Sequence, residues 1–154
     1  MMAARSTGAD AAMRLAAVAE ARRWIGTPYR HQASLKGCGA DCLGLIRGVW
    51  RELCGAEPET PPPYSQDWCE VSRDEVLWRA ASRLLVAARG DAAGDVLLFR
   101  MAEGAPAKHL AILGKVGAGT SIIHAYAGRA VIESPFIESW RRRVVAAFQF
   151  PEGD

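Results

Sequence analysis

The chain has 154 residues, half of them hydrophobic, which suffices for a single domain with a real core over residues 1–154. A net charge of +2 is close to neutral and gives no sign of a nucleic-acid-binding surface. No run of about 18 apolar residues occurs, so the sequence predicts no membrane span. Charged Arg5, Asp10 and Arg14 interrupt the first positions, so we expect no secretory signal and synthesis in the cytoplasm.

The first half of the chain has the apolar spacing of helices. Apolar residues recur at helical spacing from Met13 to Ile25, after a capping-box pattern at Thr7 and Asp10, and Gly26 ends the run. A second helix is expected from about Asp41 to Gly55. A third is expected to open with an S-x-x-E capping box at residues 72–75. Its expected buried stripe comprises Leu77, Ala80, Ala81, Leu84, Leu85 and Ala88.

The second half changes to short β-rich runs separated by glycine or proline. These runs are GDVLLF, HLAILGKV, SIIHAY, AVIES and VVAAFQF. Helices followed by strands, without β-α-β alternation, predict an α+β domain with an antiparallel sheet. Of the tryptophans, Trp24, Trp50 and Trp78 fall on helical stripes and are expected in the core. Trp68 and Trp140 lie at segment edges and could line a cleft or a partner surface.

Four cysteines are present: Cys38, Cys42, Cys54 and Cys69. The gaps between them are three, eleven and fourteen residues, unlike the two C-x-x-C pairs of a zinc ribbon. In the cytoplasm these thiols stay reduced, so a structural metal or a disulfide framework is the less favoured interpretation. Three histidines can also bind zinc, but His31 falls in an expected loop with no fixed geometry.

Cys42 is the candidate nucleophile, because it stands at the expected start of the second helix. The unpaired N–H groups and the dipole at such a position favour a thiolate, so we expect a lowered pKa. Asp41 is expected to cap the helix, and its charge opposes thiolate formation. His109 and His124 stand on two expected neighbouring strands, which would supply a base and a group that orients it. The alternative is that Cys42 is a small buried hydrophobe.

Five motifs, in this order, resemble those of NlpC-type cell-wall cysteine peptidases. They are IGTPY (25–29), GADCLGLI (39–46), GDVLLF (94–99), KHLAIL (108–113) and IIHA (122–125), within a match that covers about residues 11–150. The resemblance implies a papain-like α+β fold with N-terminal helices packed on an antiparallel sheet. It also implies cleavage of peptidoglycan stem peptides, often between D-glutamate and diaminopimelate, with no metal or organic cofactor.

The same resemblance assigns a role to each matching residue. Cys42 matches the nucleophile, His109 the general base and His124 the residue that orients it. Tyr29 matches a tyrosine near the thiol, although a turn aromatic after proline is the alternative reading. Asp41 matches the aspartate that precedes the nucleophile. The family usually has serine after the cysteine, and Leu43 departs from that pattern.

The form GADCLGLIRGVWREL is similar to the short peptidases of phage tails and gene transfer agents. This likeness implies tail baseplate or hub proteins as partners and action at the cell wall of a target cell. The expected docking surface is the proline-rich loop at residues 57–68, together with the termini. The alternatives are a structural tail-hub component with secondary or lost activity, and a thiol amidase or acyltransferase of the same fold.

Overall fold

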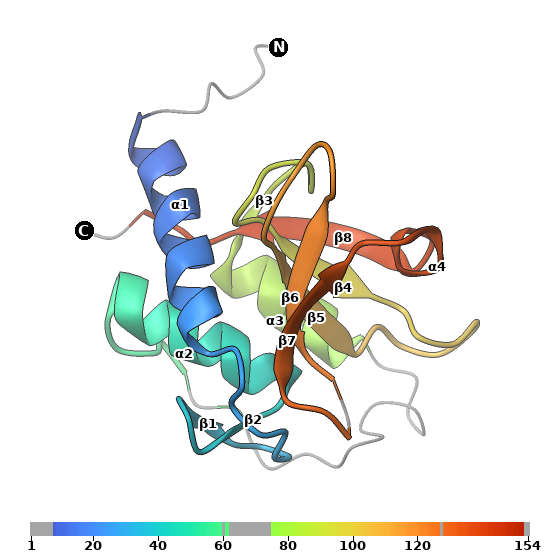
Figure 1. The fold of residues 1–154 in the computed structure, drawn as a ribbon, viewed down its shortest axis with the longest axis horizontal. Helices are drawn as coiled ribbons and strands as arrows, with labels where there is room; N and C mark the ends of the chain where they lie inside the picture. Colours follow the sequence, from blue (N-terminus) through green and yellow to red (C-terminus); the bar gives the residue numbers. More distant parts are fainter. Residues whose placement is uncertain (1–7, 60, 62–74, 127, 153–154) are drawn as a thin grey trace.

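A computed structural model describes residues 8–59, 61, 75–126 and 128–152 of the chain (Figure 1). Its helices are α1 (Gly8–Arg23), α2 (Cys42–Cys54), α3 (Val76–Leu84) and the short α4 (Glu138–Arg141). The strands are β1 (Ser34–Leu35), β2 (Gly39–Ala40), β3 (Val86–Ala87), β4 (Val96–Phe99), β5 (His109–Leu113), β6 (Ser121–Ala125), β7 (Val131–Pro135) and β8 (Val144–Gln149). No helix among these residues is long and apolar enough to cross a membrane.

The main sheet confirms the predicted fold class. Six antiparallel strands run in the order β3-β8-β4-β5-β6-β7, and β1 pairs with β2 in a separate small hairpin. All five predicted strand runs lie in this sheet. The sequence patterns missed β1, β2, β3 and α4, because two-residue strands and a one-turn helix are too short to show a period.

The helices α1 and α2 lie where they were predicted, and Gly55 ends α2 with a φ of 84°.

The capping box expected at the start of α3 is wrong in the role it gives to Glu75. Glu75 makes no capping hydrogen bond; its carboxylate accepts the N–H of Ala107 at 2.7 Å and bonds Arg100 at 2.8 Å. Thr7 and residues 72–74, which complete the two capping boxes, lie outside the described residues. Of the stripe expected for α3, only Leu77 and Ala81 are fully buried; the helix ends at Leu84, so Leu85 and Ala88 lie beyond it.

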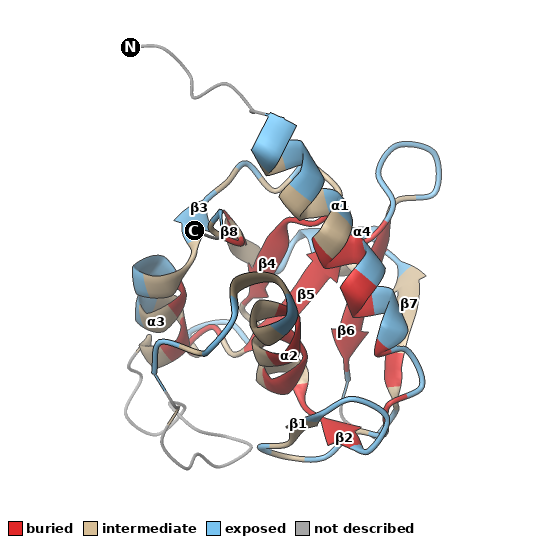
Figure 2. Ribbon diagram, turned by 90° about the vertical axis from the view of Figure 1, so that its left-hand side faces the viewer, coloured by how far each residue is buried: buried red, intermediate tan, exposed pale blue. Residues whose placement is uncertain are grey.

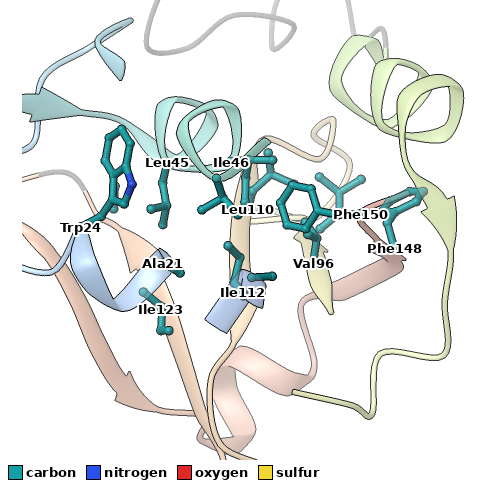
Figure 3. Close-up of a cluster of buried hydrophobic side chains, with 14 of the residues drawn as sticks. Ala21, Trp24, Leu45, Ile46, Val96, Leu110, Ile112, Ile123, Phe148 and Phe150 are labelled. Carbon is teal, nitrogen blue, oxygen red and sulfur yellow. The ribbon is translucent and has the colours of Figure 1, made fainter. Parts of the chain in front are cut away.

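The helices α1 and α2 cover one face of the sheet. Figure 2 shows them in front of β4, β5 and β6, whose residues are all buried. Figure 3 shows Leu45 and Ile46 of α2 above Ile112 and Leu110 of the sheet. Trp24, predicted in the core, is 2% exposed and packs on Gly48 of α2. A Cβ at Gly48 would lie 1.9 Å from the Trp24 ring, so a side chain there would force the two helices apart.

The other face of the sheet carries a second, smaller apolar cluster. Its buried members are Leu97, Phe99, Ala111, Leu113, Ile122 and Phe136, with Met101, Trp140, Val144 and Ala147 packed against them. Alternation along each strand sends these side chains away from α1 and α2. The short helix α4 contributes Trp140 to this face, and Figure 1 places α4 on the side of the sheet opposite α1. The sheet therefore separates the apolar cluster under α1 and α2 from the smaller cluster beside α4, and the candidate site lies between these two clusters.

Candidate active site

The start of α2 is held by the buried carboxylate of Asp41. Its Oδ1 accepts the N–H of Gly44 at 2.7 Å, which is the predicted N-cap bond, and its Oδ2 accepts the N–H of Gln32 at 2.7 Å. A Cβ at Gly44 would lie 1.9 Å from the carbonyl oxygen of Ala33, so glycine is required there. Asp41 therefore joins the loop after α1 to the first turn of α2, and this fixes Cys42 in place.

The Cys42 thiol lies against the backbone at the start of β5. Sγ donates to the carbonyl of Lys108 at 3.6 Å, and the backbone N–H groups of Leu110, Leu43 and Cys42 itself point at the sulfur. The pairing of β5 with β6 covers only residues 112–113 and 122–123. Leu110 lies beyond the last pair of that ladder, so its N–H is available to the sulfur. The thiol thus sits at the place where the two strands separate.

The pKa of the Cys42 thiol is raised to about 12. Burial is the largest cause, the negative charge of Asp41 adds to it, and the three backbone N–H groups act in the opposite direction. Our expectation of a lowered pKa at the helix start is wrong for the free protein. Desolvation and the neighbouring carboxylate outweigh the N–H groups, so the resting group is a neutral thiol.

His109 and His124 form a hydrogen-bonded pair, as the neighbouring strands predicted. His109 Nε2 lies 2.8 Å from His124 Nδ1, and His124 Nε2 lies 3.2 Å from Ser134 Oγ. In the tautomers that suit catalysis, His124 donates to Ser134 and accepts from His109. Nδ1 of His109 is then the nitrogen left to accept a proton. The residues on either side of His109, Lys108 and Leu110, are the ones that contact the Cys42 sulfur.

Both imidazoles are neutral in the folded protein. Burial, with a smaller effect of His124, lowers the pKa of His109 from 6.5 to about 3. Burial also lowers the pKa of His124, to about 4. Among the described residues no hydrogen bond joins Cys42 to His109, and the thiol proton is directed at the Lys108 carbonyl instead. The free protein therefore holds a neutral thiol beside a neutral histidine pair, and no ion pair has formed.

Tyr29 lies close to the same group of residues. Burial, followed by the charges of Cys42 and Asp41, raises the pKa of its phenol to about 12. Its backbone forms a bridge with Ala40, immediately before Asp41. The structure thus brings Tyr29, Asp41 and Cys42 together and places the Cys42 sulfur against the backbone on both sides of His109. Together with His124, these are the five site residues that the sequence indicated, and their catalytic roles remain a prediction.

Several solved structures share this fold. The NlpC/p60 domain of the peptidoglycan hydrolase SagA has 24% sequence identity and a TM-score of 0.59, over 89% of this chain and 98% of that domain. The chain has the fold of an NlpC/p60 domain. A protein of that family from Bacillus cereus has 20% identity and a TM-score of 0.59, over 89% of this chain and 40% of that one. Ly7917, solved with the hydrolyzing product of MDP, has 15% identity and a TM-score of 0.56, over 90% of this chain and 62% of that one.

Comparison of the sequence with models of known families gives no match, and comparison with curated proteins gives none. At these levels of identity, the structural neighbours establish the fold of this chain.

Three aromatic side chains lie around the histidine pair; the sequence offered Trp140 as a candidate cleft residue and gave no sign of Phe99. Phe99, Tyr126 and Trp140 surround His109 with ring centroids 5.6, 6.0 and 5.4 Å away. Alternation along β6 does place Tyr126 on the same face as His124. Trp140 comes from α4, and no sequence period connects it to the pair. The hydroxyl of Ser134 was missed for a similar reason, because only the pairing of β6 with β7 brings it to His124.

His31, the other cysteines and Leu43 are the remaining residues that the sequence singled out. His31 lies 3.9 Å from Asp41, and the described residues contain no group of three or more His, Cys, Asp or Glu side chains arranged to hold a metal ion. Cys38, Cys42 and Cys54 are free thiols, and Cys69 lies outside the described residues. The side chain of Leu43 lines a mostly apolar cavity of about 290 Å³ between α2 and α3.

The lowered pKa values of the two histidines predict a pH-dependent stability. Below pH 6.5 the two histidines of the unfolded chain become protonated, whereas those of the folded protein stay neutral down to about pH 3 to 4. Stability should therefore fall as the pH drops through this window, by on the order of 2 kcal/mol per histidine between pH 7 and pH 5. Urea unfolding at both pH values measures the difference. The doubly substituted His109→Gln, His124→Gln protein should lose much less; an equal loss would show that other groups cause it.

The pKa of Cys42 should respond to the charge of Asp41. Asp41→Asn keeps an oxygen that caps α2 but removes the negative charge, so the pKa of the thiol should fall. At pH 8, iodoacetamide should therefore label Cys42 several-fold faster in the variant, as measured by mass spectrometry of the modified peptide. Cys38 is an exposed free thiol and serves as the internal reference. Unchanged labelling of Cys42 would show that the charge of Asp41 does not control the thiol.

Proposed function

We propose that this chain is a thiol hydrolase of bacterial cell-wall peptides. The observation that carries the proposal is the position of the Cys42 thiol. It lies at the N-terminus of α2, against the backbone on both sides of His109, whose imidazole is bonded to His124. A thiol next to an imidazole that a third group orients is the arrangement needed for nucleophilic acyl transfer.

The reaction proceeds through an acyl-enzyme. Nδ1 of His109 takes the proton of Cys42 as the sulfur attacks the scissile carbonyl carbon. The N–H groups at the start of α2, which already point at the sulfur, stabilise the oxyanion that forms beside it. His109 then protonates the leaving amine, and water attacks the thioester and regenerates the thiol. His124 keeps the imidazole of His109 oriented throughout.

The fold and the motif resemblance support a substrate class. SagA is a peptidoglycan hydrolase, and its NlpC/p60 domain matches this chain over almost its whole length. For this chain we propose peptidoglycan stem peptides as substrate and the bond between D-glutamate and diaminopimelate as the cleaved bond. No metal or organic cofactor takes part in the proposed steps. Addition of EDTA should therefore leave the rate unchanged.

Substitution of the three central residues tests this function. Purified muropeptides are incubated with each variant, and their cleavage products are measured by mass spectrometry. Cys42→Ala and His109→Gln should each lose activity by a factor of about 100 or more. Alanine has no nucleophilic sulfur, and the amide of glutamine is no base at neutral pH. His124→Gln should keep measurable activity, because an amide still hydrogen-bonds to His109.

Cys38→Ala is the matched control, since Cys38 is a free and exposed cysteine four residues before Cys42. It should retain the wild-type rate. Equal losses in the two histidine variants would refute the division of roles between them. Cleavage that persists in Cys42→Ala would refute the thiol mechanism as a whole.

The resemblance to short tail-associated peptidases supports a site of action. We propose that the protein is carried on a phage-like or gene-transfer-agent tail, bound to baseplate or hub proteins, and that it opens the target cell wall locally. The protein should then co-purify with intact tail particles and stay bound through a salt wash, because a partly apolar interface resists salt. Immunoblots of gradient-purified particles measure this. Its presence only in the soluble fraction of the lysate would refute carriage and leave the hydrolase proposal intact.

One observation favours a second candidate, a thiol amidase or acyltransferase acting on an apolar acyl group. The mostly apolar cavity between α2 and α3 begins at Leu43 and Leu110, each directly after a proposed catalytic residue. Turnover of a long-chain acyl amide, with no release of muropeptide products, would favour this candidate. The reverse result would favour the peptidase.

A further inference from the structure

Trp140 contacts both histidines of the pair at once. Its ring centroid lies 5.4 Å from that of His109, with the planes tilted by 30°, and 5.1 Å from that of His124, at 89°. One face of the indole thus lies over His109, while the two rings of Trp140 and His124 meet at a right angle. Phe99 and Tyr126 contact Trp140 at 5.4 and 5.6 Å and complete an aromatic wall.

This wall stands on the face of the sheet opposite α2. Phe99 pairs with His109 across β4 and β5, so both side chains leave the sheet on the same side, together with Trp140. The neighbouring pair, Leu98 and Leu110, belongs to the cluster under α2. The imidazole of His109 therefore lies between the sheet and α4. His109 is 7% exposed and His124 is 2% exposed, although Tyr126 beside them is 38% exposed.

We propose that Trp140 is a positioning residue for the His109–His124 pair: its ring fixes the planes of both imidazoles and excludes water from them. This role deepens the proposed function, since it takes His109 as the base. A rotated His109 would break its bond to His124 and would move Nδ1, the nitrogen that acts as the base in the proposed mechanism. The bulky indole over the ring prevents that rotation, because packed side chains at this density have few alternative rotamers.

Two effects of the indole on the charge of His109 compete. An aromatic face attracts an imidazolium and so raises its pKa. The exclusion of water acts in the opposite direction, and burial is the leading cause that lowers the pKa of His109 from 6.5 to about 3. Burial dominates the net shift, and the indole supplies part of that burial, so loss of the indole should raise the pKa of His109.

The other groups that surround His109 do not change the expected direction of its pKa shift. From β6 it is faced by His124 and Tyr126. Phe99 on β4 and Trp140 on α4 carry no charge. Within the described part of the chain, His124 is the one group whose charge affects the pKa of His109.

The test is an NMR titration of the histidine rings, which needs no substrate. In the Trp140→Ala protein the pKa of His109 should rise by about one unit or more above the wild-type value. Trp140→Phe should restore a value close to wild type, since the smaller ring still covers the pair. Trp78→Ala is the matched control, because Trp78 is a half-buried tryptophan on α3 that packs in the other cluster.

An unchanged titration in a folded Trp140→Ala protein would overturn the proposal. So would an equal rise in Trp78→Ala, because the shift would then come from general loosening. Should Trp140→Ala not fold, Trp140→Leu removes the ring and keeps an apolar side chain, and it should show a rise that Trp140→Phe does not. If muropeptides remain uncleaved while the titration shifts as expected, the proposed function fails and the positioning role of Trp140 stands.

Discussion

The packing of α2 on β5 is the contact on which the candidate site depends. Leu45 and Ile46 of α2 bury their side chains against Leu110 and Ile112, and this places the first turn of the helix at the point where β5 and β6 separate. The buried carboxylate of Asp41 then sets the start of α2. A shift of α2 by a single turn, about 5.4 Å, would carry Cys42 away from the residues that flank His109.

The same packing explains why Cys42, His109 and His124 are uncharged at neutral pH. A thiol pressed against a buried strand loses its water, as do two imidazoles covered by aromatic rings. Burial therefore raises the pKa of Cys42 and lowers those of His109 and His124. The helix N-terminus supplies N–H groups to the sulfur, but Asp41, which is needed to cap that helix, opposes their effect.

The longer elements leave local signals in the sequence and could be predicted from it, and contiguous motifs single out the candidate residues of the site. Helical and alternating periods located α1, α2 and the five long strand runs, and the motifs around Cys42, His109 and His124 are contiguous. What it could not predict depends on tertiary contacts. Glu75 was expected to cap α3 but bonds Ala107 and Arg100 instead. Trp140 meets the histidines only because α4 folds back over the far face of the sheet. The direction of the pKa shift of the Cys42 thiol depends on how deeply the thiol is buried, and no local sequence pattern encodes that depth.

In the free protein Cys42 and His109 are both neutral, and this affects how the thiol can react. An ion pair between Cys42 and His109 would place two charges in a desolvated site, which is unfavourable unless other groups stabilise them. The N–H groups of Leu43, Leu110 and Cys42 point at the sulfur, but alone they do not offset its burial. In the proposed reaction, proton transfer to His109 is therefore favourable only together with attack on the carbonyl, when the negative charge moves on to the oxyanion. A thiol that remains protonated until then also resists oxidation, because the thiolate is the form that oxidants attack.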